Sequence, residues 1–207
     1  MLQQNGKPSL AYHQSYVTIR DMILNGAIPA GTKVTEEKLA SDLGYSRTPI
    51  RESLRRLEQE GLIVNKRVAK PTEKDLRNTF QVRILLEGFS ARCAATYLPE
   101  HDLASLEECV SIGKRGTIEE IMEANEKFHD LIVQASNNPV MIEIIDRMQS
   151  IIYLFRHTVV KFNRPFLIEE HESICEAIRK RDADSAEQLM KEHLQTDLEF
   201  CLHLFKG

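Results

Sequence analysis

Three of the seven histidines in this 207-residue sequence fall on apolar faces of segments with helical periodicity. These three faces consist of Ile118, Ile121, Met122, Asn125, His129 and Ile132; of Leu167, His171, Ile174 and Ile178; and of Ala186, Leu189, His193, Thr196 and Phe200. His171 and His193 are each 11 residues from Asp182, where the chain is expected to reverse, so an antiparallel helix pair would hold them at one level. Imidazoles that converge inside a bundle are ligands for zinc or a similar transition metal. The alternative for any single histidine is a hydrogen-bonded side chain in the core.

A second group of candidate residues lies on the segment 47–60, which also has helical periodicity. One face of it is apolar and consists of Ile50, Leu54 and Leu57. Arg47, Thr48 and Arg51 lie roughly 120° around the helix from that face. Arginine is the usual bidentate reader of guanine in the major groove, and threonine contacts a thymine methyl or a phosphate. A solvated helix face would show the same charges, so this pattern alone leaves both interpretations open.

Three helices and a hairpin are expected before residue 70. The helices are predicted at 11–25, 36–44 and 47–60, with Thr35 and Ser46 as N-caps. Two short strands at 62–64 and 65–72 would surround a basic turn at Asn65, and Lys66 and Arg67 would contact phosphates or the neighbouring minor groove. This order of elements is that of a winged helix-turn-helix.

The remaining chain has helical period almost throughout. Residues 69–72 form the expected boundary between a domain at 1–70 and a domain at 71–207. Helices are predicted in the second domain at 73–98, 101–113, 117–136, 138–162, 165–180 and 183–204. The expected fold class is therefore mostly α, with a winged helix-turn-helix followed by an antiparallel six-helix bundle.

Composition limits the classes of function. The net charge of −4 is uneven, because residues 1–70 carry 11 Lys and Arg against 7 Asp and Glu, and the rest carries 16 against 24. A basic small domain joined to an acidic larger one fits a DNA reader with a sensor. No apolar run approaches the ~20 residues of a membrane span, and no secretory signal is recognisable, so a cytoplasmic protein without a membrane partner is expected. The four widely spaced cysteines predict buried thiols and no disulfide.

The stretch LASDLGYSRTPIRESLRRLEQEGLI at 39–63 closely resembles the DNA-binding domain of the GntR family of bacterial regulators. The preceding LNGAIPAGTKVTEEKLA at 24–40 resembles it as well. The resemblance implies that Arg47 and Arg51 read bases and that Ser46 and Thr48 contact phosphates of double-stranded operator DNA. Many relatives place a glycine at the tip of the wing, whereas residues 65–69 contain none.

The second domain resembles the FadR-type branch of that family, with an FCD domain in its six-helix version. The resemblance lies in VRILLEGFSARCAA (82–95), NEKFH (125–129), SNNP (136–139) and the last two helices. It implies that an Asp and three His bind a divalent metal beside an effector, and the corresponding residues here are Asn125, His129, His171 and His193. Zinc or nickel is the expected ion, although Asn125 replaces the usual Asp and brings no charge.

The missing charge leads to a hypothesis about the effector. The carboxylate of an organic acid would complete the metal site, and Arg83 resembles a family position that anchors such a group. The alternatives are an ordinary ion pair between Arg83 and a neighbouring glutamate, and a weak or lost metal site. Tyr153, His157 and Asn163 fit either a pocket or a subunit interface.

The expected function is a homodimeric transcription regulator, by resemblance a repressor, that an effector releases from its operator. It is not expected to be an enzyme. The first alternative is a dimeric DNA-binding protein with structural histidines that needs no effector. The second is a metallohydrolase, for which Glu126 and Glu170 adjoin ligand candidates but diverge from them on a helix.

Overall fold

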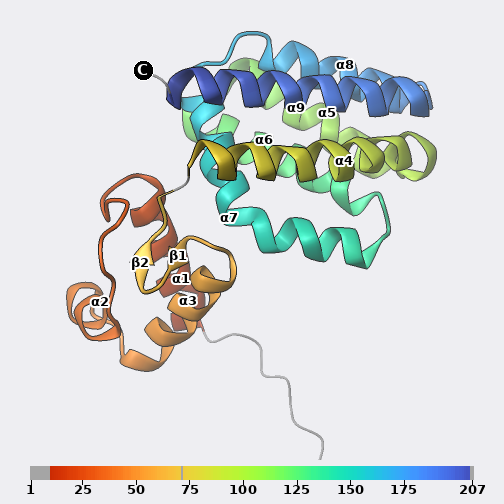
Figure 1. Ribbon diagram of the computed structural model, residues 1–207. Helices are drawn as coiled ribbons and strands as arrows, with labels where there is room; N and C mark the ends of the chain where they lie inside the picture. Colours follow the sequence, from red (N-terminus) through yellow and green to blue (C-terminus); the bar gives the residue numbers. More distant parts are fainter. Residues whose placement is uncertain (1–9, 71, 206–207) are drawn as a thin grey trace, which may run out of the picture. The chain divides into compact units, whose positions relative to one another are not determined.

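A computed structural model describes residues 10–70 and 72–205 of the chain (Figure 1). The side chains of residues 149, 150, 153–159 and 205 lie outside that description. The chain forms two compact units that divide between Lys70 and Pro71. A small α/β unit with a wing precedes an all-helical unit, and the predicted fold class is confirmed.

The first unit contains the expected order of three helices and a hairpin. Its elements are α1 (Leu10–Leu24), α2 (Glu36–Leu43), α3 (Arg47–Gln59), β1 (Ile63–Val64) and β2 (Arg67–Val68). Each helix begins and ends within one residue of its predicted limits. The apolar face of α3 is buried, as expected, and packs against α1.

The helix-turn-helix connection is fixed by local chemistry. Thr35 accepts a hydrogen bond from the backbone N–H of Lys38 at 3.3 Å, and Gly44 ends α2 with a left-handed φ of 72°. Ser46 occupies the predicted N-cap position of α3, but its side chain makes no capping hydrogen bond. Pro49, the third helical residue, lacks one of the two backbone N–H groups from which a capping hydroxyl usually accepts.

The wing is a hairpin whose two strands are joined by a two-residue turn without glycine. Ile63 pairs with Val68 and Val64 with Arg67, and the turn residues Asn65 and Lys66 have φ values of 52° and 58°. Two consecutive positive φ angles are typical of a type I′ turn, whose twist matches the strands. Asparagine tolerates this conformation well, and so the basic tip forms despite the departure from the glycine of many relatives.

A buried polar cluster holds α1 against the end of α3. The hydroxyl of Tyr16 donates to the carboxylate of Glu60 at 2.9 Å, and Nε of Arg56 donates to the same carboxylate at 2.7 Å. The guanidinium of Arg56 also lies 4.0 Å from the centroid of the Tyr16 ring. Burial, together with the negative charge of Glu60, raises the pKa of Tyr16 from 10.0 to about 12.

Tyr16→Phe is therefore expected to lower the free energy of unfolding of the first unit by about 1–3 kcal/mol at neutral pH, because a buried hydrogen bond to a charged group is lost. The raised pKa means that the folded state favours the neutral phenol. This stabilisation is fully present below pH 10 and is lost as the pH rises towards 12. Urea unfolding from pH 7 to 11 measures both effects. The exposed Tyr97→Phe is the control, and an identical pH dependence in Tyr16→Phe and wild type would refute the assignment.

The second unit consists, in its described residues, of six helices that form a bundle. They are α4 (Glu73–Tyr97), α5 (Glu100–Arg115), α6 (Ile118–Gln134), α7 (Pro139–Lys161), α8 (Leu167–Arg179) and α9 (Ala183–Phe205). Figure 1 shows α4 and α9 running alongside each other, and these two helices pack extensively. None of the helices in the described part of the chain combines the length and the hydrophobicity that spanning a bilayer requires.

The end of α5 corrects one prediction. The helix was expected to stop at Gly113 but continues to Arg115, and Gly116 takes the C-cap position. Gly113 instead permits close packing of α5 on α8, because a Cβ atom there would lie 2.5 Å from Cδ1 of Ile168.

The four cysteines are free and buried, as predicted. Burial raises the pKa of Cys175 to about 11 and that of Cys201 to about 12. A thiol with so high a pKa is almost entirely protonated at neutral pH and is a poor nucleophile. These cysteines therefore behave as small core residues.

Candidate functional site

The N-terminal part of α3 presents the polar side chains expected to face DNA. Ser46, Arg47, Thr48 and Arg51 are all exposed there. Nη2 of Arg47 donates to Oε1 of Glu37 on α2 at 2.8 Å, so this arginine is held by a surface ion pair in the free protein. Such a pair is worth little in water, which leaves Arg47 available to another partner.

The wing contributes two more basic residues. Lys66 is exposed at the tip, whereas Nη1 of Arg67 donates to the carbonyl oxygen of Gly31 at 2.9 Å and so ties the wing to the preceding loop. Arg55, which sequence reasoning missed, lines one surface groove with Arg47, Arg51 and Lys66. The available signal was its spacing of four residues from Arg51, which puts both on one side of α3.

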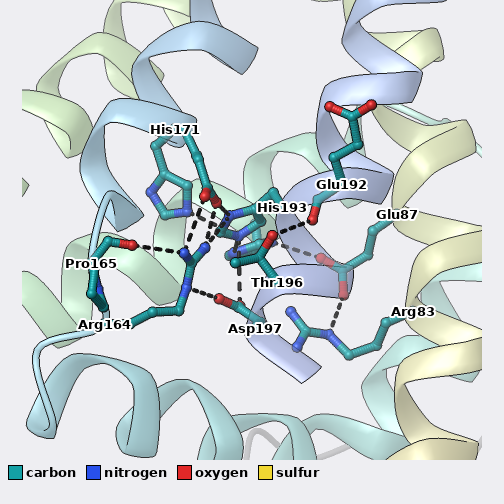
Figure 2. Close-up of polar contacts among 11 residues, drawn as sticks. Arg83, Glu87, Arg164, Pro165, His171, Glu192, His193, Thr196 and Asp197 are labelled. Atoms are coloured by element: carbon teal, nitrogen blue, oxygen red, sulfur yellow. Dashed lines mark hydrogen bonds and ion pairs between the residues drawn. The ribbon is translucent and has the colours of Figure 1, made fainter. Parts of the chain in front are cut away.

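The three histidines from α6, α8 and α9 meet in the interior of the second unit. His129, His171 and His193 are each at most 2 % exposed. Nε2 of His193 lies 3.3 Å from Nε2 of His171 and 3.4 Å from Nε2 of His129. Figure 2 shows His171 and His193 pointing towards each other, at the same level, as their equal spacing from Asp182 predicted.

The outer nitrogens of two imidazoles bind carboxylates. Nδ1 of His129 lies 2.7 Å from Oε2 of Glu87, and Nδ1 of His193 lies 2.8 Å from Oε2 of Glu170. In the tautomer that carries its hydrogen on Nδ1, the imidazole donates that hydrogen to the carboxylate, and the lone pair of Nε2 then faces inward. Nitrogen lone pairs only 3.4 Å apart repel one another unless a proton or a cation lies between them. The donor set is therefore suited to a divalent transition metal.

Asn125 lies one turn before His129 on the same face of α6 and is 3 % exposed. Neither its Oδ1 nor its Nδ2 has a hydrogen-bond partner among the described residues. Because buried amides are normally satisfied, this group indicates a missing ligand. Phe128 stacks on the ring of His171 with 4.2 Å between centroids and fixes the plane of that imidazole. The residues thus fit a metal.

Arg83 on α4 is fully buried. Its Nε donates to Oε1 of Glu87 at 2.7 Å, so the ion pair considered as an alternative is present. Its Nη1 and Nη2, however, have no partner among the described residues. Glu87 joins this guanidinium to His129, and so the two groups belong to one network.

Sequence reasoning missed a buried charge cluster on the other side of the histidines. Arg164 and Asp197 are almost completely buried, and Nε of Arg164 donates to Oδ1 of Asp197 at 2.5 Å (Figure 2). Arg164 also binds Glu170. Burial alone would lower the pKa of Arg164, but the two carboxylates outweigh it and raise that pKa. Burial likewise opposes ionisation of Glu170, yet His193 and Arg164 hold the pKa of Glu170 below its ordinary value.

Of the three residues left undecided by the sequence, Asn163 is the one whose side chain the structure describes. Asn163 is exposed beyond the end of α7, with a φ of 50°, and lines a surface groove with Ile118 and Phe166. The side chains of Tyr153 and His157 lie outside the described residues.

The two units of the chain each match a known protein family. A winged helix-turn-helix joined to an all-helical unit is an architecture typical of transcription regulators that read DNA. Residues 11–68 match the bacterial regulatory proteins of the gntR family, and residues 78–196 match the FCD domain. The chain belongs to the GntR family and carries an FCD domain.

Relatives similar to this chain have corresponding descriptions. One is the HTH-type transcriptional regulator YdhC of Bacillus subtilis, 30 % identical over 97 % of this chain and 95 % of its own length. Another is the HTH-type transcriptional repressor RspR of Escherichia coli, 27 % identical over 88 % of this chain and 85 % of its own length. The solved structure of E. coli McbR/YncC has the same fold, with a TM-score of 0.77 at 22 % identity, covering 99 % of this chain and all of the other.

Proposed function

We propose that the protein is a cytoplasmic repressor whose binding to operator DNA is controlled by a small carboxylate effector and a divalent transition metal. The single observation that carries the proposal is a set of buried polar atoms without a hydrogen-bond partner among the described residues, namely Nη1 and Nη2 of Arg83 and both amide atoms of Asn125. Similarity to RspR, which is described as a repressor, supports the direction of control. Cytoplasmic location follows from the need to reach chromosomal DNA.

In this proposal α3 enters the major groove. Arg47 and Arg51 read base edges, and Ser46 and Thr48 contact the backbone. Lys66 and Arg55 contact phosphates on either side, and Arg67 mainly stiffens the wing through Gly31. The uncapped hydroxyl of Ser46 supports a role outside the helix cap.

The effector is proposed to bind through a carboxylate to the two free Nη groups of Arg83 and to the metal held by the histidines. A fork of two N–H donors suits the two oxygens of a carboxylate. Glu87 contacts both Arg83 and His129 at 2.7 Å, so binding at one end reorients the other. Effector and metal are therefore expected to bind cooperatively.

The protein is proposed to act as a homodimer. Leu85 and Phe89 on α4 are 66 % and 46 % exposed, and they lie four residues apart on one side of the helix. Val140 and Ile144 form a similar exposed pair on α7, and α4 contacts α7. A second copy of the chain that covers these apolar pairs would join two DNA-reading units in one homodimer.

Arg51→Ala tests the DNA-reading role. A preferred sequence is first selected from random duplexes with the wild-type protein, and affinities are then measured by fluorescence anisotropy. The variant is expected to lose about 1–3 kcal/mol on the selected sequence and less on random DNA, because a base contact carries specificity. Lys66→Ala is the matched control, since loss of a phosphate contact weakens both duplexes equally. Equal losses for Arg51→Ala would remove it from the base-reading role.

A further inference from the structure

Asp197 lies one helical turn after His193 on α9, and its side chain is buried beside the imidazoles (Figure 2). We propose that Asp197 is the charged ligand of the metal site and supplies the carboxylate that Asn125 lacks. This inference rests on the proposed metal site and specifies which residue carries its negative charge.

The carboxylates around the histidines approach different nitrogens. Glu87 and Glu170 bind Nδ1 atoms, which point away from the centre of the cluster. Oδ2 of Asp197 instead lies 3.7 Å from Nε2 of His193, the nitrogen that faces the other two imidazoles. Of these three acidic residues, Glu87 and Glu170 can orient ligands, whereas Asp197 is in position to become one.

The distances between the Nε2 atoms of the histidines agree with binding of one shared metal ion. Donor atoms that lie about 2.1 Å from zinc in a tetrahedral site are about 3.4 Å from each other. Nε2 of His193 is 3.3 Å from Nε2 of His171 and 3.4 Å from Nε2 of His129. Among the described residues, the group of converging donor atoms consists of His129, His171 and His193. Oδ2 of Asp197 lies 3.7 Å from Nε2 of His193 and outside that group, so the carboxylate must move towards the ion to become a fourth ligand.

The two oxygens of the Asp197 carboxylate have different neighbours. Nε of Arg164 donates to Oδ1 at 2.5 Å, whereas Oδ2 lies 3.7 Å from Nε2 of His193. The guanidinium groups of Arg83 and Arg164 face three carboxylates, those of Glu87, Asp197 and the partly exposed Glu170, so with neutral imidazoles the cluster has one negative charge in excess. A divalent cation reverses that excess, and one effector carboxylate then restores neutrality. The charge that Asn125 cannot provide is thus already present in the bundle.

The test compares Arg164→Gln with the double variant Arg164→Gln/Asp197→Asn. Neither variant leaves a buried guanidinium without a partner. Urea denaturation must show that both stay folded, because Arg164→Gln leaves the buried carboxylate of Asp197 without its guanidinium. Zinc affinity is measured by competition with a chromophoric chelator, and the coordination of cobalt by its visible absorption bands. Relative to Arg164→Gln, the double variant is expected to bind zinc more than 100-fold more weakly, beyond the 10–100-fold typical of residues that only orient a ligand, and to shift the cobalt bands.

Asp184→Asn is the matched control, because Asp184 is an aspartate on the same helix with an 86 % exposed side chain, and it should behave as wild type. Equal zinc affinities and cobalt spectra for the single and double variants, in a protein that does bind zinc, would overturn the role of Asp197 and leave the histidine site intact. Failure of the wild-type protein to bind zinc at all would overturn the metal site and the role of Asp197 together.

Discussion

Replacing His171 and His193 together with alanine is expected to reduce the bound transition metal from about one ion per chain to none. The two side chains supply two of the three inward-facing nitrogens, which lie within 4.8 Å of one another in the wild-type protein. One remaining imidazole binds a divalent ion too weakly to survive purification. Elemental analysis of untagged protein, purified without chelator and after equilibration with zinc, nickel or manganese, measures the difference.

The matched control is His101→Ala/His203→Ala, which removes two exposed histidines from the same domain. It should retain the full metal content. Circular dichroism must show that both double variants keep their helices, because the buried pair leaves cavities. Metal retained after loss of His171 and His193, or no metal in the wild type under any of these conditions, would contradict the site.

Arg83→Met is expected to lower the free energy of unfolding by about 3–5 kcal/mol, because it leaves the buried carboxylate of Glu87 without its guanidinium. Both side chains are fully buried, and the Nε–Oε1 distance is 2.7 Å. Methionine occupies a similar volume, so loss of charge rather than loss of packing dominates the effect. Urea denaturation of the metal-free protein measures it.

Arg83→Met/Glu87→Met separates stability from effector binding. Removal of both charges should restore most of the stability, since no buried ion is left unpaired. Any carboxylate that releases the wild-type protein from DNA should have no effect on this double variant, which lacks the proposed anchor. The zinc affinity of the same variant must be measured alongside, because Glu87 also binds Nδ1 of His129. Release at the wild-type concentration of that acid would exclude Arg83 as the anchor, whatever the stability of the variant.

Sequence periodicity did not predict correctly which residues of α9 are buried after His193. The inward face predicted from His193 continued through Thr196 and Phe200, at spacings of three and seven residues. The helix instead buries Asp197, Leu198 and Cys201, and Thr196 is exposed. A helix permits both choices, and an aspartate is rarely assigned to a core. Its burial depends on Arg164, 33 residues earlier in the chain, which no local pattern connects to it.

Sequence patterns predicted those features that depend only on neighbouring residues in the chain. The cap at Thr35, the left-handed Gly44 and the turn at Asn65 depend on their own neighbours in sequence, and the structure contains all three. The meeting of His171 and His193 was predictable because one chain reversal relates them. The roles of Glu87 and Glu170 were not, because each binds a histidine on a different helix.

The close packing at Gly113 bears on which substitutions near the histidine cluster the bundle can accept. Ile168, which fills the space that a side chain at position 113 would need, lies three residues before His171 on α8. A larger residue at position 113 would first have to push the end of the Ile168 side chain aside, because its Cβ atom would lie 2.5 Å from Cδ1 and 3.2 Å from Cγ1 of Ile168. Such a substitution would therefore alter the packing of α5 against the first turn of α8, one turn before His171, without replacing any candidate ligand.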